Sequence, residues 1–151
     1  MSEPLVCVVD ASVAIKLFVA EPLSDRADAL FDHLAANPPG QFYVPDLLFA
    51  ECANILWKHV RRFGYPSESA RQDVADLSAL ALRTVSTADV IAEVLTIALA
   101  HDITAYDACY VALAQQLRIP LVTADEALVR KLAGTTHDVQ WLGTFAIPPL
   151  P

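Results

Sequence analysis

Short apolar runs alternate with longer segments of helical periodicity along the chain. The run Leu5-Val-Cys-Val-Val9 is continuous and rich in valine, a pattern typical of a strand that is buried on both faces of a parallel sheet. Similar short runs follow at regular intervals. The pattern predicts five strands, at residues 5–9, 42–44, 82–85, 120–123 and 139–142.

Helical patterns fill the intervals between these strands, and turn residues separate them. Asn37-Pro-Pro-Gly40 and Phe63-Gly-Tyr-Pro66 each stop a helix. We predict helices at residues 11–19, 24–36, 46–62, 67–80, 87–100, 104–117 and 125–132. The stretch 90–100 is largely apolar but falls short of the roughly 20 residues that span a bilayer, so we expect a buried helix there.

Strands that alternate with helices indicate βα units with right-handed crossovers. The predicted fold class is therefore α/β, a three-layer α/β/α arrangement with a short, mainly parallel central sheet. No repeat or linker divides the sequence, and we expect a single domain over residues 1–151.

Composition excludes several classes of protein. Hydrophobic residues make up 55% of the chain and charged residues 19%, too apolar a balance for a disordered chain. Cys7, Cys52 and Cys109 are odd in number and lie in apolar sequence, so we expect reduced core thiols. The N-terminus carries Glu3 where an export signal has a cation, which favours a cytoplasmic protein with no membrane association.

Two acidic residues directly follow predicted strands. Asp10 ends the first apolar run, and Asp125 follows the strand at 120–123. In parallel sheets, ligands bind beyond the carboxyl ends of the strands, so both side chains are candidate site residues. Each has a simpler interpretation: Asp10 as a helix N-cap, and Asp125 as an acid beside a capping box formed by Thr123 and Glu126.

Asp107 and Glu51 lie within predicted helices. Asp107 is the one charged residue in the segment Ala105–Ala114, and such an apolar helix is usually buried, so its carboxylate needs a cation or a donor. Glu51 shares a helical stripe with Asn54 and Lys58, followed by Arg61 and Arg62. The stripe is either a solvated helix face or the wall of a cleft whose basic residues meet phosphates.

Four carboxylates in one pocket would repel one another unless cations neutralised their charge. Clustering would therefore imply a metal, and all-oxygen ligands favour Mg²⁺ or Mn²⁺. The four histidines do not have the spacing of zinc ligands. The net charge of −8 opposes binding to a polyanion, and two bound divalent ions would reduce it only to −4.

In order, the segments VVDASV, FAECANILW, TAYDACYVALA and LVTADEAL resemble the successive acidic motifs of the PIN-domain ribonucleases. The resemblance covers nearly the whole chain. Within this family the chain is most similar to the VapC-type toxins of toxin-antitoxin pairs. It implies hydrolysis of RNA phosphodiester bonds with Mg²⁺ or Mn²⁺, held by Asp10, Glu51, Asp107 and Asp125, with Asp10 and Asp107 as the principal ligands.

The same resemblance implies further residues and partners. Ser12 and Thr123 match small hydroxyl positions near the metal. The toxin branch implies a homodimer and a small antitoxin whose basic or aromatic tail fills the acidic groove, a partner that suits the negative charge of the chain.

Two other classes of function remain open from the sequence. A phosphate-transfer protein of receiver or haloacid-dehalogenase type also places an Asp after a strand, although this chain has Asp10-Ala-Ser12 instead of D-x-D and Thr123 where a receiver needs Lys. A non-catalytic binding module would use the acids only as caps. A Rossmann-type nucleotide site is not supported, because the four glycines form no GxGxxG or P-loop motif.

Overall fold

The central sheet has five parallel strands in a computed structural model that describes residues 3–151. The strand order is β3-β2-β1-β4-β5. Each strand coincides with one of the predicted apolar runs, which confirms the parallel α/β fold. The strands are β1 (Val6–Val9), β2 (Gln41–Pro45), β3 (Arg83–Val85), β4 (Leu121–Thr123) and β5 (Val139–Trp141).

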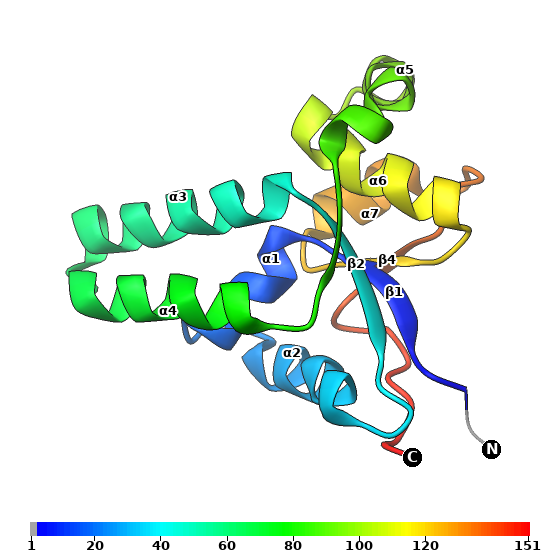
Figure 1. Ribbon diagram of the computed structural model, residues 1–151. Coiled ribbons are helices and arrows are strands. Elements are labelled where there is room, and N and C mark those ends of the chain that lie inside the picture. The colour runs from blue at the N-terminus through cyan, green and yellow to red at the C-terminus, as the bar shows by residue number, and fades with distance from the viewer. Residues whose placement is uncertain (1–2) are drawn as a thin grey trace.

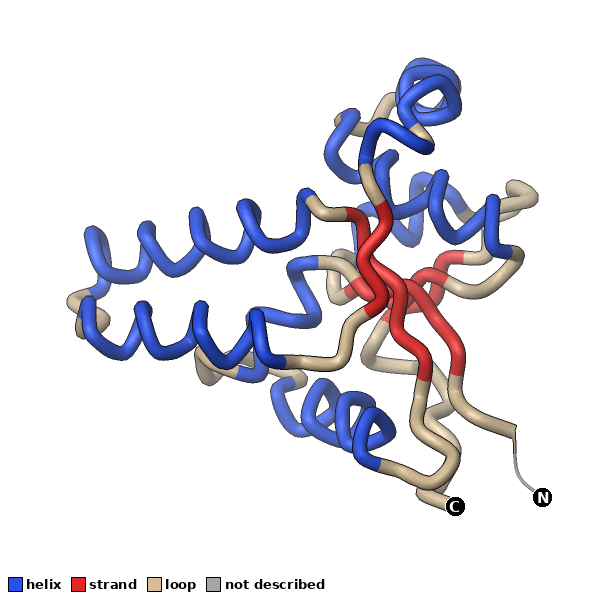
Figure 2. The backbone as a smooth tube through the Cα atoms, in the orientation of Figure 1, coloured by secondary structure: helices blue, strands red, loops and turns tan. Residues whose placement is uncertain are grey.

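Helices connect successive strands and cover the sheet in two layers (Figures 1 and 2). Helices α1 to α4 connect β1 to β2 and β2 to β3, which moves the chain toward one edge of the sheet. Helices α5 to α7 connect β3 to β4 and β4 to β5, which moves it toward the other edge. Because the crossovers are right-handed, the two groups of helices cover opposite faces. The helices are α1 (Ala11–Ala14), α2 (Ser24–Phe31), α3 (Leu47–Phe63), α4 (Ser67–Ala79), α5 (Ile91–His101), α6 (Ala105–Leu117) and α7 (Glu126–Leu132). Short 3₁₀ turns occupy Ile15–Leu17, Asp32–Ala35 and Thr87–Asp89.

The core lies between the sheet and α6. Residues 108–114 of this helix are all buried, against buried residues of β1 and β4. All three cysteines are buried and free, as predicted. On the other face, α3 buries Leu48, Cys52 and Leu56 at four-residue spacing and ends at Gly64, whose left-handed backbone (φ +67°) suits a residue without a Cβ atom.

The prediction of a buried helix at 90–100 is wrong. Helix α5 buries only Val94 and Ile97, while Ile91, Leu95 and Leu99 are 54%, 60% and 76% exposed. One face of α5 packs on α6, and within residues 3–151 nothing covers the opposite face, where these three side chains lie. No described helix is both long and apolar enough to cross a bilayer.

The segment after β5 returns across the molecule to α2 (Figure 1). Arg26 fastens it there, because the guanidinium donates from Nε to the carbonyl oxygen of Leu142 (2.6 Å) and from Nη2 to that of Phe145. A single domain over residues 1–151 stays a prediction, since Met1 and Ser2 lie outside the described residues.

Candidate functional site

Four acidic side chains line one pocket beyond the carboxyl ends of β1 and β4. The strand order reverses between these two strands, which makes this point the expected position of a ligand site in a parallel sheet. The pocket has a volume of about 170 Å³. Its acidic residues are Asp10 after β1, Glu51 from α3, Asp107 in the first turn of α6 and Asp125 after β4.

Asp10 is the most enclosed of the four, with 6% of its surface exposed. Its Oδ1 accepts a hydrogen bond from the Ser12 hydroxyl (2.5 Å), and its Oδ2 accepts one from the Thr123 hydroxyl (2.5 Å). Oδ1 also caps α1 by accepting from the backbone N–H of Val13 (3.3 Å). Helix capping therefore accounts for only one of the three hydrogen bonds of Asp10. The Ser12 and Thr123 hydroxyls fix the orientation of its carboxylate.

Burial raises the pKa of Asp10 to about 6, although its three hydrogen bonds oppose the shift, and the charge of Asp107 contributes to the rise. The pKa of Glu51 is raised by burial and by the charge of Asp107, against the hydrogen bond from Tyr110. The pKa of Asp107 is raised by burial and then by Asp125. Ionised together, these groups form an anionic cup.

Tyr110 holds Glu51 in place. This buried side chain on α6 donates its hydroxyl to Glu51 Oε1 (2.5 Å), a bond that joins α6 to α3 across the pocket. Tyr110 is not among the site residues predicted from the sequence. Its position three residues after Asp107, on the same helical face, is the signal that could have identified it.

Asp125 is exposed and caps α7. Its Oδ1 accepts from the backbone N–H groups of Ala127 (3.0 Å) and Leu128 (3.2 Å). The predicted capping box of Thr123 and Glu126 is wrong, because Asp125 itself is the N-cap of α7. Thr123 is buried and donates its hydroxyl to Asp10. Thr123 also accepts from the backbone N–H of Asp125 (3.1 Å), so one hydroxyl connects the two acidic residues.

The basic stripe predicted on α3 lies outside this pocket. Ile55 follows Glu51 in the lining, whereas Asn54 and Lys58 are exposed and line neither this pocket nor the one beside it. A contact between these two side chains and a substrate stays a prediction.

The four acidic side chains that line the pocket offer only carboxylate oxygens, which are the ligands that hard divalent cations prefer. In the described conformation, residues 3–151 hold no group of three or more acidic, histidine or cysteine side chains placed around a single ion. Both oxygens of Asp10 accept hydrogen bonds from hydroxyls, and one oxygen of Glu51 accepts one from Tyr110. Oδ2 of Asp10 and Oε1 of Glu51 each keep a lone pair that a cation could use.

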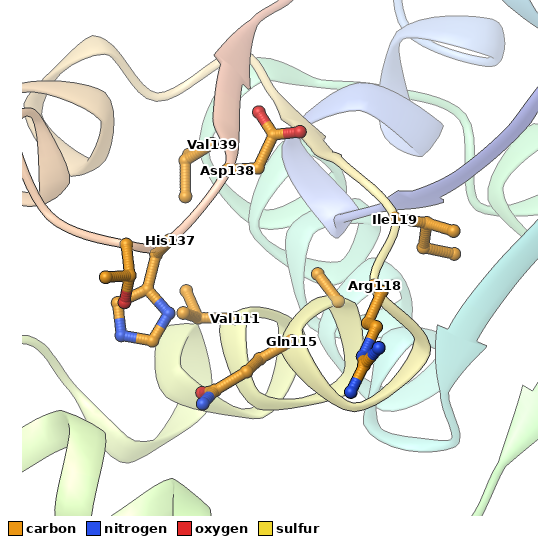
Figure 3. Close-up of a pocket in the computed structure, with 9 residues that line it drawn as sticks. Val111, Gln115, Arg118, Ile119, His137, Asp138 and Val139 are labelled. Atoms are coloured by element: carbon orange, nitrogen blue, oxygen red, sulfur yellow. The ribbon is translucent and has the colours of Figure 1, made fainter.

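A larger pocket, about 390 Å³ in volume, lies at the opposite edge of the sheet (Figure 3). It is lined by α6 residues such as Val111 and Gln115 and by His137 and Val139 at the start of β5. None of the four acidic residues contributes to its lining. Size therefore does not identify the carboxylate site, which is distinguished by its chemistry.

Comparison with known proteins agrees with this arrangement. The model of the PIN domain family matches residues 7–133. The chain is 36% identical over 126 residues to Ribonuclease VapC3 of Pyrobaculum aerophilum, a match that covers 82% of this chain and 92% of the relative.

Two solved structures share the fold. A crystal structure of the Pyrobaculum aerophilum protein PAE2754 superposes with a TM-score of 0.69 at 24% identity, over 93% of this chain and 86% of that one. A chain from a toxin-antitoxin complex of Klebsiella pneumoniae superposes with a TM-score of 0.59 at 18% identity, over 88% of this chain and 94% of that one.

Proposed function

The chain belongs to the PIN domain family, and from that premise we propose that it is a ribonuclease dependent on divalent metal ions and the toxin of a toxin-antitoxin pair. The observation that carries the proposal is the convergence of Asp10, Glu51, Asp107 and Asp125 on one pocket. The 36% identical relative is named a ribonuclease, and the fold is shared with a chain from a toxin-antitoxin complex.

The proposed cofactor is Mg²⁺ or Mn²⁺, because both ions prefer carboxylate oxygens. Asp10 and Asp107 would be the principal ligands. Glu51 and Asp125 would hold a second ion or orient the ligands of the first. Bound ions of this kind activate a water molecule for attack on phosphorus and stabilise the leaving oxygen.

The protein's own contribution is to fix the carboxylates before substrate binds. Ser12 and Thr123 donate to the two oxygens of Asp10, and Tyr110 donates to Glu51. The side chain of Asp125 is held by backbone N–H groups of α7. Fixing these groups in advance lowers the reorganisation needed when charge develops on the phosphate. No side chain of the protein is required as a nucleophile in this scheme.

The proposed partners are an RNA substrate and a small antitoxin with a basic or aromatic tail. A chain with a net charge of −8 and an acidic pocket attracts cationic groups. A basic tail in the pocket would exclude the metal ions and the RNA together. The homodimer expected from the resemblance stays a prediction. Since an RNA-cleaving toxin must meet cellular RNA, the cytoplasm is its proposed site of action.

The test is incubation of the purified protein with a mixed pool of structured and unstructured RNAs, in Mg²⁺, in Mn²⁺ or with chelator. We expect cleavage with metal and none with chelator. Asp10→Asn and Asp107→Asn should fold and lose most activity, because the exchange keeps the side-chain size and removes the charge. Asp28→Asn, on an exposed position of α2, is the matched control and should keep full activity. Undiminished, metal-dependent cleavage by a folded Asp10→Asn variant would refute the assignment.

The capping roles of Asp10 and Asp125 favour a second candidate, a binding module without catalysis. Calorimetry with Mn²⁺ separates the two candidates. Carboxylates that serve only as helix caps should bind the ion no better than the surface acids do, whereas an anionic pocket should bind it at a defined stoichiometry that Asp10→Asn abolishes.

A further inference from the structure

The acidic pocket continues into a second compartment, about 130 Å³ in volume. The two compartments share Asp107 and Asp125. Thr104 and Lys131 line the second compartment and not the first. The two compartments together are called the groove; they share two acids, and the second one carries an ammonium group.

Lys131 differs from the other basic residues of the chain in its position. Among the described residues, 3–151, it is the one lysine or arginine that lines either compartment. Its neighbour Arg130 points toward Glu126 on the exposed side of α7 (4.0 Å), and Lys16 pairs with Glu21 (3.3 Å). Within residues 3–151 Lys131 forms no ion pair, and its charge lies close enough to Asp107 to lower the pKa of that carboxyl.

The position of the ammonium group is fixed by the backbone. Lys131 Nζ donates to the carbonyl oxygen of Asp102 (2.7 Å), which lies at the end of α5. Asp102 has a left-handed backbone (φ +53°), a conformation that turns the chain between α5 and α6. One of the three ammonium protons is used in this bond, and two remain for other acceptors.

Thr104 lines the same compartment as Lys131. Its Oγ1 accepts from the backbone N–H of Asp107 (3.1 Å) as the N-cap of α6, and its side chain also lowers the pKa of the Asp107 carboxyl by hydrogen bonding. Lys131 therefore carries the cationic donor of the compartment that Asp10 does not line.

We propose that Lys131, which lines the compartment beside Thr104, binds a backbone phosphate of single-stranded RNA adjacent to the phosphate that is cleaved. This inference rests on the proposed ribonuclease function. An acidic cup with bound ions can hold the scissile phosphate, but a chain with a net charge of −8 repels the rest of the strand. A cation fixed in the groove offsets this repulsion at one neighbouring phosphate and sets the direction of the strand.

The test measures binding and cleavage separately. Fluorescence anisotropy with a short labelled RNA of mixed sequence, in Ca²⁺, gives Kd and its dependence on KCl concentration. Cleavage of the same RNA in Mn²⁺ gives kcat and KM. The variants are Lys131→Ala, Lys131→Arg and the control Arg130→Ala, which removes the same charge one position earlier on the same helix.

We expect Lys131→Ala to weaken RNA binding about tenfold and to reduce the slope of log Kd against log salt by about 0.7, the value for one phosphate contact on a single strand. KM should rise accordingly, and kcat should stay within about twofold. Lys131→Arg should restore most of the affinity, because guanidinium also binds phosphate. Arg130→Ala should leave Kd, KM and the salt slope unchanged.

The inference is overturned if Lys131→Ala matches Arg130→Ala in affinity and salt slope, or if it lowers kcat with KM unchanged, which would indicate a structural role through Asp102. Failure of the proposed function gives a different result. In that case the wild-type protein binds the RNA but does not cleave it in Mn²⁺, while the Lys131 comparison in Ca²⁺ still gives an answer. If the wild-type protein does not bind RNA, both proposals fail.

Discussion

Replacement of Asp10 by Asn should stabilise the metal-free protein at neutral pH while it removes activity. The Asp10 carboxylate is buried, and its pKa is raised from 3.8 to about 6. The folded protein therefore binds the Asp10 proton more tightly than the unfolded chain does. The contribution of Asp10 to stability is fully present below about pH 4, and it is lost as the pH rises through 6.

The size of the effect follows from the shift in pKa. A shift from 3.8 to about 6 is equivalent to about 3 kcal/mol of unfolding free energy at pH 7. Asn removes the buried charge and keeps the helix cap, since Asn is also a good N-cap residue. Its NH₂ group needs an acceptor, and the hydroxyl oxygen of Ser12 or Thr123 can supply one after rotation of its proton. Because this rearrangement is imperfect, we expect a net gain of about 1 to 3 kcal/mol, or a rise in Tm of about 2 to 12 °C.

Urea unfolding in the presence of chelator, followed by tryptophan fluorescence at pH 4, 5.5, 7 and 8, measures this gain. Asp10→Asn and wild type should be closest in stability at pH 4 and should diverge as the pH rises to 7. Addition of Mn²⁺ at pH 7 should stabilise wild type and not the variant. Asp28→Asn is the control and should follow wild type at every pH. An Asp10→Asn variant that is less stable than wild type at pH 7 without metal, by the same amount at every pH, would show that the buried charge of Asp10 does not destabilise the folded protein.

Three further substitutions test the hydrogen bonds and packing around the site. Tyr110→Phe should lower RNA cleavage more at pH 6 than at pH 8, because loss of its bond raises the pKa of Glu51 further and leaves less carboxylate ionised at low pH; an equal loss in kcat at both pH values would contradict this. Thr123→Val should lower the unfolding free energy by about 1 to 3 kcal/mol in urea titrations, since it leaves the N–H of Asp125 without its acceptor, whereas Thr123→Ser should be nearly neutral. Leu113→Ala, at a fully buried position of α6, should cost about 2 to 5 kcal/mol in the same assay; a cost below 1 kcal/mol would show that α6 is not packed as described.

Elements governed by local sequence could be predicted closely. Buried parallel strands are continuous apolar runs, so β1 and β4 lie within a residue of their predicted bounds. Helix α3 ends where Gly64 permits a left-handed backbone, and α6 begins after Thr104 caps it. In each case the signal lies within a few residues of the boundary.

The exposure of α5 could not be predicted in the same way. Its apolar pattern is compatible with burial on all sides, but burial depends on which elements pack against the helix. Helix α6 covers it along one face, and Leu95 and Leu99 on the other face remain exposed.

In the site too, features set by neighbouring residues could be predicted, and contacts between residues far apart in the sequence could not. The sequence indicated Asp10 and Asp125 because both follow strands. It led to an incorrect capping role for Thr123, because the contact with Asp10 joins residues 113 positions apart. Tyr110 resembles a core residue, and its spacing from Asp107 is the signal that could have identified it. Lys131 gave no distinct signal, because it resembles a surface cation at the end of a helix.

Asp10, Glu51, Asp107 and Asp125 are proposed to form a site for divalent cations. Diffraction from crystals soaked in Mn²⁺, measured near the manganese absorption edge, tests it most directly, because the anomalous signal locates the ion without reference to any assay. We expect a peak in the pocket bounded by these four carboxylates, within reach of Asp10 and Asp107, and no such peak in Asp10→Asn crystals. A saturating soak that leaves the pocket without an anomalous peak, or places the ion on other residues, would rule out a metal site at these carboxylates.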